Sequence, residues 1–174
     1  MMYEAMKTLL ERRSCRSFQS KPVKEETLQA VLQAGLYAPS AMNRQSAIMV
    51  VSQDPEEIAL MSKLNAAVMG ADTDPFYGAP CVVIVLADTN VPTWVEDGSL
   101  VLGNLMNAAH ACGLGSCRIN RARQVFDSEE GKQLLQKWGI PEGYRGVGNC
   151  ILGYPEGECR PAAIRRPNRI CFTK

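Results

Sequence analysis

The run CVVIVLA, from Cys81 to Ala87, is an uninterrupted apolar segment rich in β-branched residues. A strand with one solvated face alternates polar and apolar residues, whereas a strand covered on both faces does not. The run therefore predicts a strand that lies between two layers. Around it, long helical patterns alternate with three or four short strand patterns, which indicates an α+β or α/β layered domain.

On both sides of this strand, the spacing of apolar residues and the helix-capping residues predict further helices and strands. Helices are predicted from Tyr3 to the arginines at 12–16, from Pro22 to Leu36, from Pro55 to Val68, from Pro92 to Cys112 and from Ser128 to Trp138. Further strands are predicted at 47–51, 116–119 and 144–154, followed by a tail at 159–174. The apolar end of the tail, Ile170 to Phe172, favours docking of the tail onto a surface.

Glycines follow the long helix at Gly113 and Gly115, but they do not form a dinucleotide-binding fingerprint. That motif needs a third glycine where Arg118 stands, and it needs a helix after it rather than before it. Gly113 is better explained as the residue that ends the helix. The pair Gly146 and Gly148 fails the same test.

Length and charge bound the class of protein. A chain of 174 residues without repeats or linkers predicts one domain, residues 1–174. Nineteen Lys and Arg against 18 Asp and Glu offer no broad basic field, so we expect no nucleic acid and no membrane partner. No apolar run approaches the roughly 18 residues of a membrane span, and the N-terminus lacks the apolar core of a signal peptide. We therefore expect a cytoplasmic protein.

The seven cysteines are odd in number and form no C-x-x-C pair, which argues against a zinc ribbon and against a closed disulfide framework. We expect reduced thiols, several of them buried, and no metal site. The single histidine, His110, has no nearby carboxylate pattern, so it is interpreted as a packed residue or one that complements the helix dipole. Asn65 lies one position off an apolar stripe and is interpreted as solvated, with a ligand contact as the alternative.

Three guanidinium groups and a hydroxyl lie within five residues at Arg12-Arg13-Ser14-Cys15-Arg16. Arginines present planar forks of donors that can share a phosphate dianion, so the cluster is suited to phosphate binding. The alternative is that basic residues at a helix C-terminus only complement the helix dipole. A second loop, Ala38 to Ser46, carries short polar side chains that either present donors to a ligand or simply stop a helix.

Five segments, taken together and in order, resemble the nitroreductase family over essentially the whole chain. They are residues 12–18 (RRSCRSF), 38–45 (APSAMNRQ), 104–116 (NLMNAAHACGLGS), 141–144 with 153–155 (PEGY and GYP), and 165–167 (RRP). The resemblance implies an α+β fold with a mainly antiparallel central sheet flanked by helices, in an intertwined homodimer. It also implies an FMN-dependent oxidoreductase that takes hydride from NADH or NADPH and reduces a small electron-poor acceptor, such as a nitroaromatic or a quinone, by a ping-pong mechanism.

The resemblance also assigns site residues. Those next to the phosphate, the ribityl chain and the pyrimidine edge of FMN would be Arg12, Arg13, Ser14 and Arg16, with Arg165 returning to the phosphate. The other subunit would supply Pro39, Ser40 and Asn43 against the isoalloxazine, and the backbone at Arg118, Ile119 and Asn120 would cover the flavin face. A cationic Arg16 would stabilise the anionic reduced flavin. No catalytic side chain and no metal are implied, because the flavin carries the chemistry.

The chain departs from the family pattern at three places. Ser46-Ala47 stands where Pro-Trp is usual, Arg118 stands where an aromatic is frequent, and Ala163 stands where a second basic residue of the tail is expected. Few aromatic residues then remain to stack on a substrate ring, so a flavin carrier or redox-responsive module is the alternative function. Dehalogenation or flavin fragmentation is a third possibility, for which the interval from Gly70 to Ala79 is short.

Overall fold

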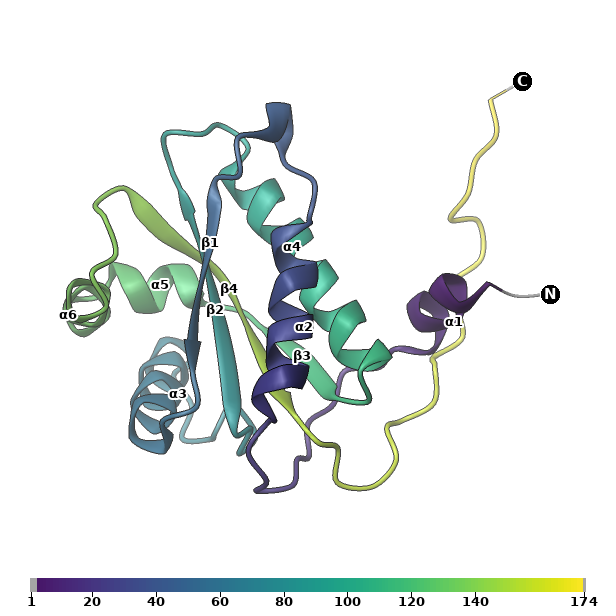
Figure 1. Cartoon of the computed structure of the whole chain (residues 1–174), viewed down its shortest axis with the longest axis horizontal. Coiled ribbons are helices and arrows are strands. Elements are labelled where there is room, and N and C mark those ends of the chain that lie inside the picture. Colours follow the sequence, from purple (N-terminus) through teal and green to yellow (C-terminus); the bar gives the residue numbers. More distant parts are fainter. Residues whose placement is uncertain (1–2, 174) are drawn as a thin grey trace.

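The structure, a computed structural model, describes residues 3–173 (Figure 1). These residues form a four-stranded sheet in the order β1-β2-β4-β3. Its strands are β1 (Ala47–Ser52), β2 (Cys81–Asp88), β3 (Gly115–Ile119) and β4 (Tyr144–Gly153). Each neighbouring pair in this sheet is antiparallel. The α+β alternative with an antiparallel sheet is therefore confirmed.

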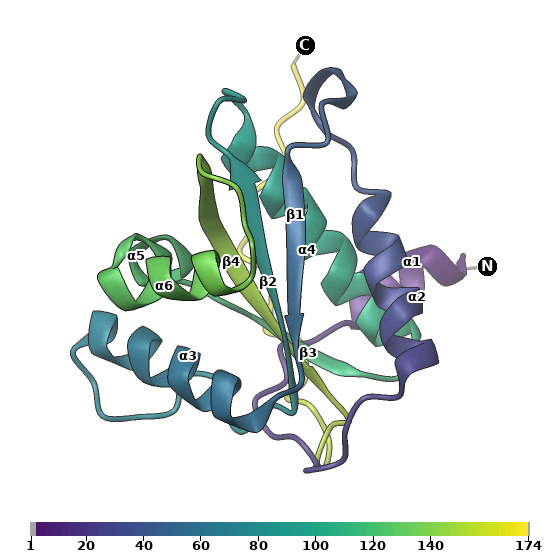
Figure 2. The ribbon, with the colours of Figure 1, turned by 60° about the vertical axis from the view of Figure 1, so that its left-hand side comes forward.

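Helices cover both faces of the sheet (Figures 1 and 2). They are α1 (Glu4–Glu11), α2 (Glu25–Leu36), α3 (Pro55–Met69), α4 (Trp94–Ala111), α5 (Ala122–Asp127) and α6 (Glu129–Lys137), with a short 3-10 turn, η1 (Ala41–Asn43). Helices α2 and α4 lie on one face, and α3, α5 and α6 lie on the other.

Strand β2 has the environment that its sequence predicts. Val82 and Ile84 face the core under α3, α5 and α6, whereas Val83 and Val85 face the core under α2 and α4. All four side chains are fully buried. An apolar residue at every position is thus required because each face of the strand is packed against a helical layer.

Several helix ends follow the expected signals. The side chain of Asp54 accepts a hydrogen bond from the Glu56 amide at 2.9 Å, and Pro55 opens α3. Gly113 follows α4 with a φ of +75°, a conformation that glycine adopts without steric cost. His110 lies half-buried in the last turn of α4.

Helix α5 is an element that sequence patterning did not predict. It is only six residues long and has no side-chain N-cap, so it carries no start signal. Its residues Ala122, Val125 and Phe126 are buried against the sheet. Gly146 in β4 permits this approach, because a Cβ there would overlap the backbone carbonyl of Ala122.

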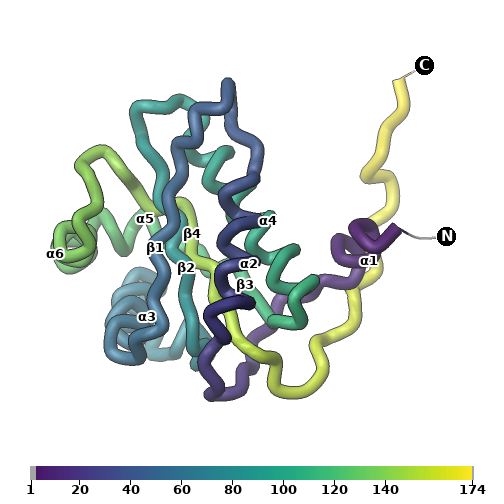
Figure 3. The backbone as a smooth tube through the Cα atoms, in the orientation of Figure 1, coloured from purple at the N-terminus to yellow at the C-terminus, as the bar shows by residue number. Residues whose placement is uncertain are grey.

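The two ends of the chain pack least. Helix α1 has no buried residue, although Leu9 and Leu10 are apolar. Residues 156–173 are exposed and run away from the sheet as an irregular tail (Figures 1 and 3). Within one chain the apolar end of the tail is not docked, contrary to the expectation: Ile170 and Phe172 are 76% and 90% exposed.

None of the helices among residues 3–173 is both long enough and apolar enough to cross a membrane.

Candidate functional site

The arginine segment runs along the free edge of β3. Ser14 forms a parallel bridge with Ser116, and the Cys15 amide donates to the Ser116 carbonyl at 2.9 Å. Cys15 is buried at this edge, while Ser14 and Arg16 are exposed on either side of it. The sheet edge thus holds the segment in extended form and leaves alternate side chains facing outward.

The neighbouring arginines have different partners. Arg13 donates from Nη1 to the carbonyls of Leu10 and Arg12, each at 2.7 Å, so it caps the end of α1. Helix capping, the alternative function of this cluster, therefore accounts for Arg13. The Arg16 guanidinium lies 5.8 Å from the centre of the Tyr77 ring, a distance at which a cation is weakly attracted to a ring face.

Arg12 is the member of the cluster that the chain leaves unsatisfied. Its Nη1 is buried and has no hydrogen-bond partner among the described residues. The hydroxyl of Ser116, the residue bridged to Ser14, is the other buried side-chain polar atom found without a partner. A buried donor of a charged group is costly when it is left unpaired. An anionic oxygen would satisfy Arg12, so the residues present fit a phosphate group.

The positive charge of Arg12 also affects the pKa of a thiol inside the sheet. Burial raises the pKa of the Cys150 thiol in β4 far above its usual value, and the nearby Arg12 guanidinium opposes that rise. Burial likewise raises the pKa of Cys81 to about 12. Both thiols are therefore inert at neutral pH, and all seven cysteines, which lie within residues 3–173, are free. Cys15, Cys81, Cys117 and Cys150 are buried, as expected from the sequence for several of the cysteines.

The next predicted site segment, residues 118–120, lies at the C-terminal end of strand β3. Arg118 is exposed and its Nη2 lies 3.5 Å from the Val147 carbonyl, while Ile119 is buried. The backbone carbonyl of Asn120 accepts a hydrogen bond from Asn65 Nδ2 at 2.9 Å. This end of β3 is thereby fixed to helix α3.

Asn65 itself corrects the interpretation made from the sequence. Its side chain is fully buried rather than solvated, and its Oδ1 accepts from Arg121 Nε at 3.0 Å. A buried carboxamide is stable when its polar atoms are paired, and here both its oxygen and its nitrogen are. Its position one residue off the apolar stripe was the available signal, but the partners lie 55 and 56 residues away.

The loop that contains Pro39, Ser40 and Asn43 lies elsewhere. Figure 1 shows it at the top of the molecule, between α2 and β1, whereas the segment after α1 runs at the lower right. Arg165 lies in the exposed tail, which starts next to the N-terminal segment, because the Glu156 amide donates to the Ser17 carbonyl at 3.0 Å. One chain thus brings residues 12–16 together with β3, whereas the 39–43 loop lies at another end of the molecule.

A cavity of about 850 Å³ lies between α3 and residues 72–80 and contains none of the predicted site residues. Asp74 shapes its wall by accepting hydrogen bonds from the hydroxyl of Ser62 and from the amides of Phe76 and Gly78. Burial by itself raises the pKa of Asp74, but these hydrogen bonds bring it below the usual value. The Asp74 carboxylate therefore stabilises the turn at residues 74–78 and joins it to helix α3.

Among residues 3–173, no three His, Cys, Asp or Glu side chains gather as metal ligands would.

The fold is α+β with an antiparallel sheet, and the buried Arg12 nitrogen without a described partner at its edge is suited to an anionic group. Residues 9–75 match the model of the nitroreductase family. The chain is 31% identical over 163 residues to an Archaeoglobus fulgidus protein provisionally named NADH dehydrogenase/NAD(P)H nitroreductase, covering 90% of this chain and 88% of the relative. The chain belongs to the nitroreductase family.

Solved structures agree with that assignment. A nitroreductase with bound FMN from Bacteroides fragilis superimposes with a TM-score of 0.91 at 24% identity, covering 99% of this chain and 100% of the other. One from Desulfitobacterium hafniense, also with bound FMN, superimposes with a TM-score of 0.89 at 27% identity, covering 100% of both chains. The nitroreductase-like fold predicted from the sequence is confirmed.

Proposed function

We propose that the chain is an FMN-dependent oxidoreductase that passes hydride from NADH or NADPH to a small electron-poor acceptor. Membership of the nitroreductase family, the NAD(P)H in the name of the Archaeoglobus relative and the FMN in both crystal structures support this function. The same matches favour an enzyme over a flavin carrier. The free thiols of all seven cysteines, within the described residues, support a cytoplasmic location.

The observation that carries the proposal is the buried Arg12 Nη1, which has no acceptor in the part of the chain that the structure describes. A flavin phosphate bears about 1.5 to 2 negative charges near neutral pH, which is enough to engage Arg12 together with other donors. Arg13 and Ser14 lie in the same segment, and Arg165 would join them from the tail. Arg16 would take the pyrimidine edge, and the backbone of residues 118–120 would cover the flavin face.

Bound FMN would supply the redox chemistry by accepting a hydride and passing it on. The chain's own residues bind and orient the flavin and set its electrostatic surroundings. Arg16 is exposed and lies 5.8 Å from the centre of the Tyr77 ring, and at the pyrimidine edge it would supply a permanent positive charge where negative charge develops on reduction. No side chain needs to act as an acid or base for this role.

We further propose that the single domain, residues 1–174, works as an intertwined homodimer. Helix α1 and the tail expose apolar side chains that one chain leaves uncovered, including Leu9, Leu10 and Phe172. Large apolar groups gathered on exposed elements are typical of surfaces that a partner covers. In such a dimer, Pro39, Ser40 and Asn43 of one subunit would reach the flavin of the other, as the family resemblance implies.

A flavin spectrum tests the function directly. Purified protein supplied with FMN should retain a yellow flavin spectrum, bleach with NADH or NADPH in the absence of oxygen, and recover its colour with a nitroaromatic or a quinone. Arg12→Ala should release FMN, whereas Arg123→Ala, which removes an arginine stacked 4.7 Å from the Trp94 ring, should retain it. A wild-type protein that binds no FMN would overturn the proposal.

A further inference from the structure

Asp97, in the first turn of α4, is a buried carboxylate that holds the loop before β1. It is 3% exposed. Its Oδ1 accepts from the Ala41 amide at 3.1 Å, and its Oδ2 accepts from the Ser46 hydroxyl at 2.8 Å and from the Thr93 hydroxyl at 3.4 Å. The carboxylate thus joins both ends of the 41–46 loop to one helix.

Asp97 has no cationic partner among the described residues. Burying a carboxylate without a counter-charge is unfavourable unless several donors surround it. Ser46, which donates the shortest of the three bonds, is itself buried, and it is one of the positions at which the chain departs from its family pattern. The buried hydrogen bond between Ser46 and Asp97 therefore suggests that this pair fixes the conformation of the 41–46 loop.

The loop that Asp97 holds is strained and poorly packed. Met42, Asn43 and Gln45 have φ values of +53°, +53° and +49°, in the left-handed region that side chains disfavour. Met42 is 85% exposed, and a cavity of about 100 Å³ lies under the loop beside Asp97. Because apolar packing contributes little here, hydrogen bonds keep the loop in shape.

Hydrogen bonds inside the loop also determine which donors and acceptors of Ser40 and Asn43 remain available to a ligand. The Gln45 amide donates to Ser40 Oγ at 3.0 Å, and Gln45 Nε2 donates to Asn43 Oδ1 at 3.1 Å. Both oxygens are thereby engaged, whereas no described residue accepts a hydrogen bond from the Ser40 hydroxyl or the Asn43 amide, so these groups are available as donors. Such a surface suits a planar ring that carries carbonyl oxygens and ring nitrogens.

We propose that Asp97 is a positioning residue, which holds the Pro39–Asn43 loop in its strained form so that Ser40 and Asn43 offer donors to the flavin of the partner subunit. The proposal rests on the FMN-dependent function stated above. Asp97 acts only through the loop, since its carboxylate is buried beneath it.

Asp97→Asn tests this role, because the amide keeps the size of the side chain but loses its charge and one acceptor. In the FMN-free protein, hydrogen exchange of the peptide covering residues 38–47 should accelerate at least tenfold. In titrations with FMN, the dissociation constant should rise at least tenfold, which corresponds to about 1.4 kcal/mol. Ser46→Ala, which removes one donor and leaves the carboxylate, should change both quantities in the same direction and by less. If Asp97→Asn does not fold, Ser46→Ala alone decides.

Asp54→Ala is the matched control. It removes a helix N-cap outside the loop, so it should lower the melting temperature without changing the exchange of residues 38–47 or the affinity for FMN. Unchanged exchange in Asp97→Asn would overturn the proposal whether or not the wild type binds FMN. Faster exchange with unchanged FMN affinity would also overturn it. Failure of the wild type to bind FMN would count against the proposed function, and is a separate result.

Discussion

Two adjacent arginines show how the same residue type takes different roles at one helix end. Arg13 satisfies the last carbonyls of α1, which is what a basic residue at a helix C-terminus does by default. Arg12 has a buried nitrogen, Nη1, for which residues 3–173 provide no acceptor. The unsatisfied donor, rather than the number of arginines, is the feature that supports the proposed phosphate contact.

Arg16→Ala should lower the midpoint potential of the bound flavin. Removing the positive charge disfavours the anionic reduced form, and we expect a shift of about 30 mV, a factor of ten in the equilibrium of this two-electron couple. Spectroelectrochemical titration of the bound flavin measures it. Lys21→Ala is the control, because Lys21 is a cation of the same segment that lies 4.8 Å from the Tyr154 ring. If the midpoint potential is unchanged in Arg16→Ala, the assignment of Arg16 to the pyrimidine edge of the flavin is wrong.

The role of a polar residue could be predicted from the sequence where its hydrogen-bond partner is a near neighbour in the chain. It could not be predicted where the partner lies more than 50 residues away. The capping of α3 by Asp54 depends on a neighbour two positions away. By contrast, Asp97 meets the Ala41 amide 56 residues away, and Asn65 meets Asn120 at a similar separation. Both are polar residues on helices, and spacing alone cannot tell a buried polar residue with distant partners from a solvated one.

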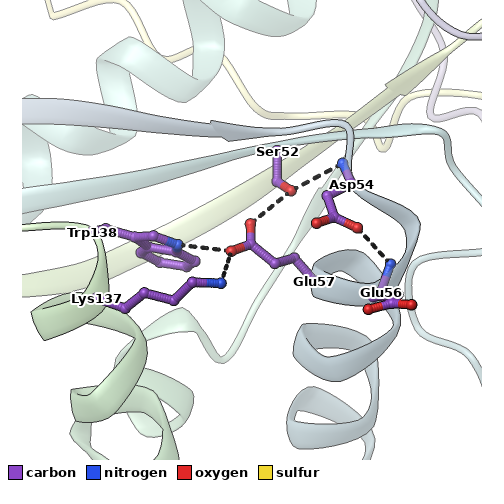
Figure 4. Close-up of polar contacts among 6 residues, drawn as sticks. All are labelled: Ser52, Asp54, Glu56, Glu57, Lys137 and Trp138. Carbon is purple, nitrogen blue, oxygen red and sulfur yellow. Dashed lines mark hydrogen bonds and ion pairs between the residues drawn. The ribbon is translucent and has the colours of Figure 1, made fainter.

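At the scale of elements, Glu57 joins helices α3 and α6. Figure 4 shows its carboxylate accepting from Lys137 Nζ at 2.8 Å and Trp138 Nε1 at 3.2 Å through Oε1, and from the Ser52 hydroxyl at 3.1 Å through Oε2. The hydrogen bond from Lys137, followed by those from Trp138 and Ser52, lowers the pKa of Glu57 despite the opposing effect of burial. The lowered pKa means that these bonds stabilise the folded state more when the Glu57 carboxylate is charged than when it is protonated.

Glu57→Gln should therefore destabilise the protein in a pH-dependent way. The folded pKa lies below the unfolded value near 4.5, so the contribution is fully present above that pH and is lost as the pH falls through the folded pKa. We expect a loss of about 1 kcal/mol at pH 7 that shrinks toward zero in acid. Urea unfolding across this range measures it. Glu56→Gln is the control, and a loss for Glu57→Gln that is independent of pH would contradict the assignment.

The close contact between α5 and β4 gives a prediction about packing. Gly146→Ala would place a methyl group against the backbone of Ala122, which cannot move aside without shifting α5. We expect a loss of about 2 kcal/mol. Gly148→Ala, on the same strand, meets the end of the Leu102 side chain at 2.8 Å, which can rotate away, and should cost less. Denaturant unfolding of both variants measures the difference, and equal losses would argue against a backbone contact.

Long or strongly capped elements were predictable and the short one was not. Strand β2 and helices α3 and α4 were predicted close to their observed bounds, because seven or more residues repeat one pattern. Helix α5 has six residues and takes its helical form from contacts with β4 and α6 rather than from its own sequence. Tertiary packing, not propensity, decides such segments.

At the scale of the whole molecule, the fold separates the parts of the proposed site. Residues 12–16 are fixed at the edge of β3, the 39–43 loop lies at the top of the molecule and Arg165 lies in the exposed tail (Figure 1). The sequence placed all three in one site only through the family resemblance, since no local pattern relates them. A second copy of the chain is the natural means of bringing the loop and the arginines together.

A mixed dimer tests this arrangement. One chain would carry Arg12→Ala and the other Ser40→Ala with Asn43→Ala, the two chains being purified together through different affinity tags. If each site combines the arginines of one chain with the loop of the other, both defects fall in the same site and the second site is intact. About half of the wild-type amount of FMN should then bind with wild-type affinity, although each variant homodimer binds FMN weakly. If instead each chain builds a whole site, every site carries one defect, and no FMN should bind with wild-type affinity.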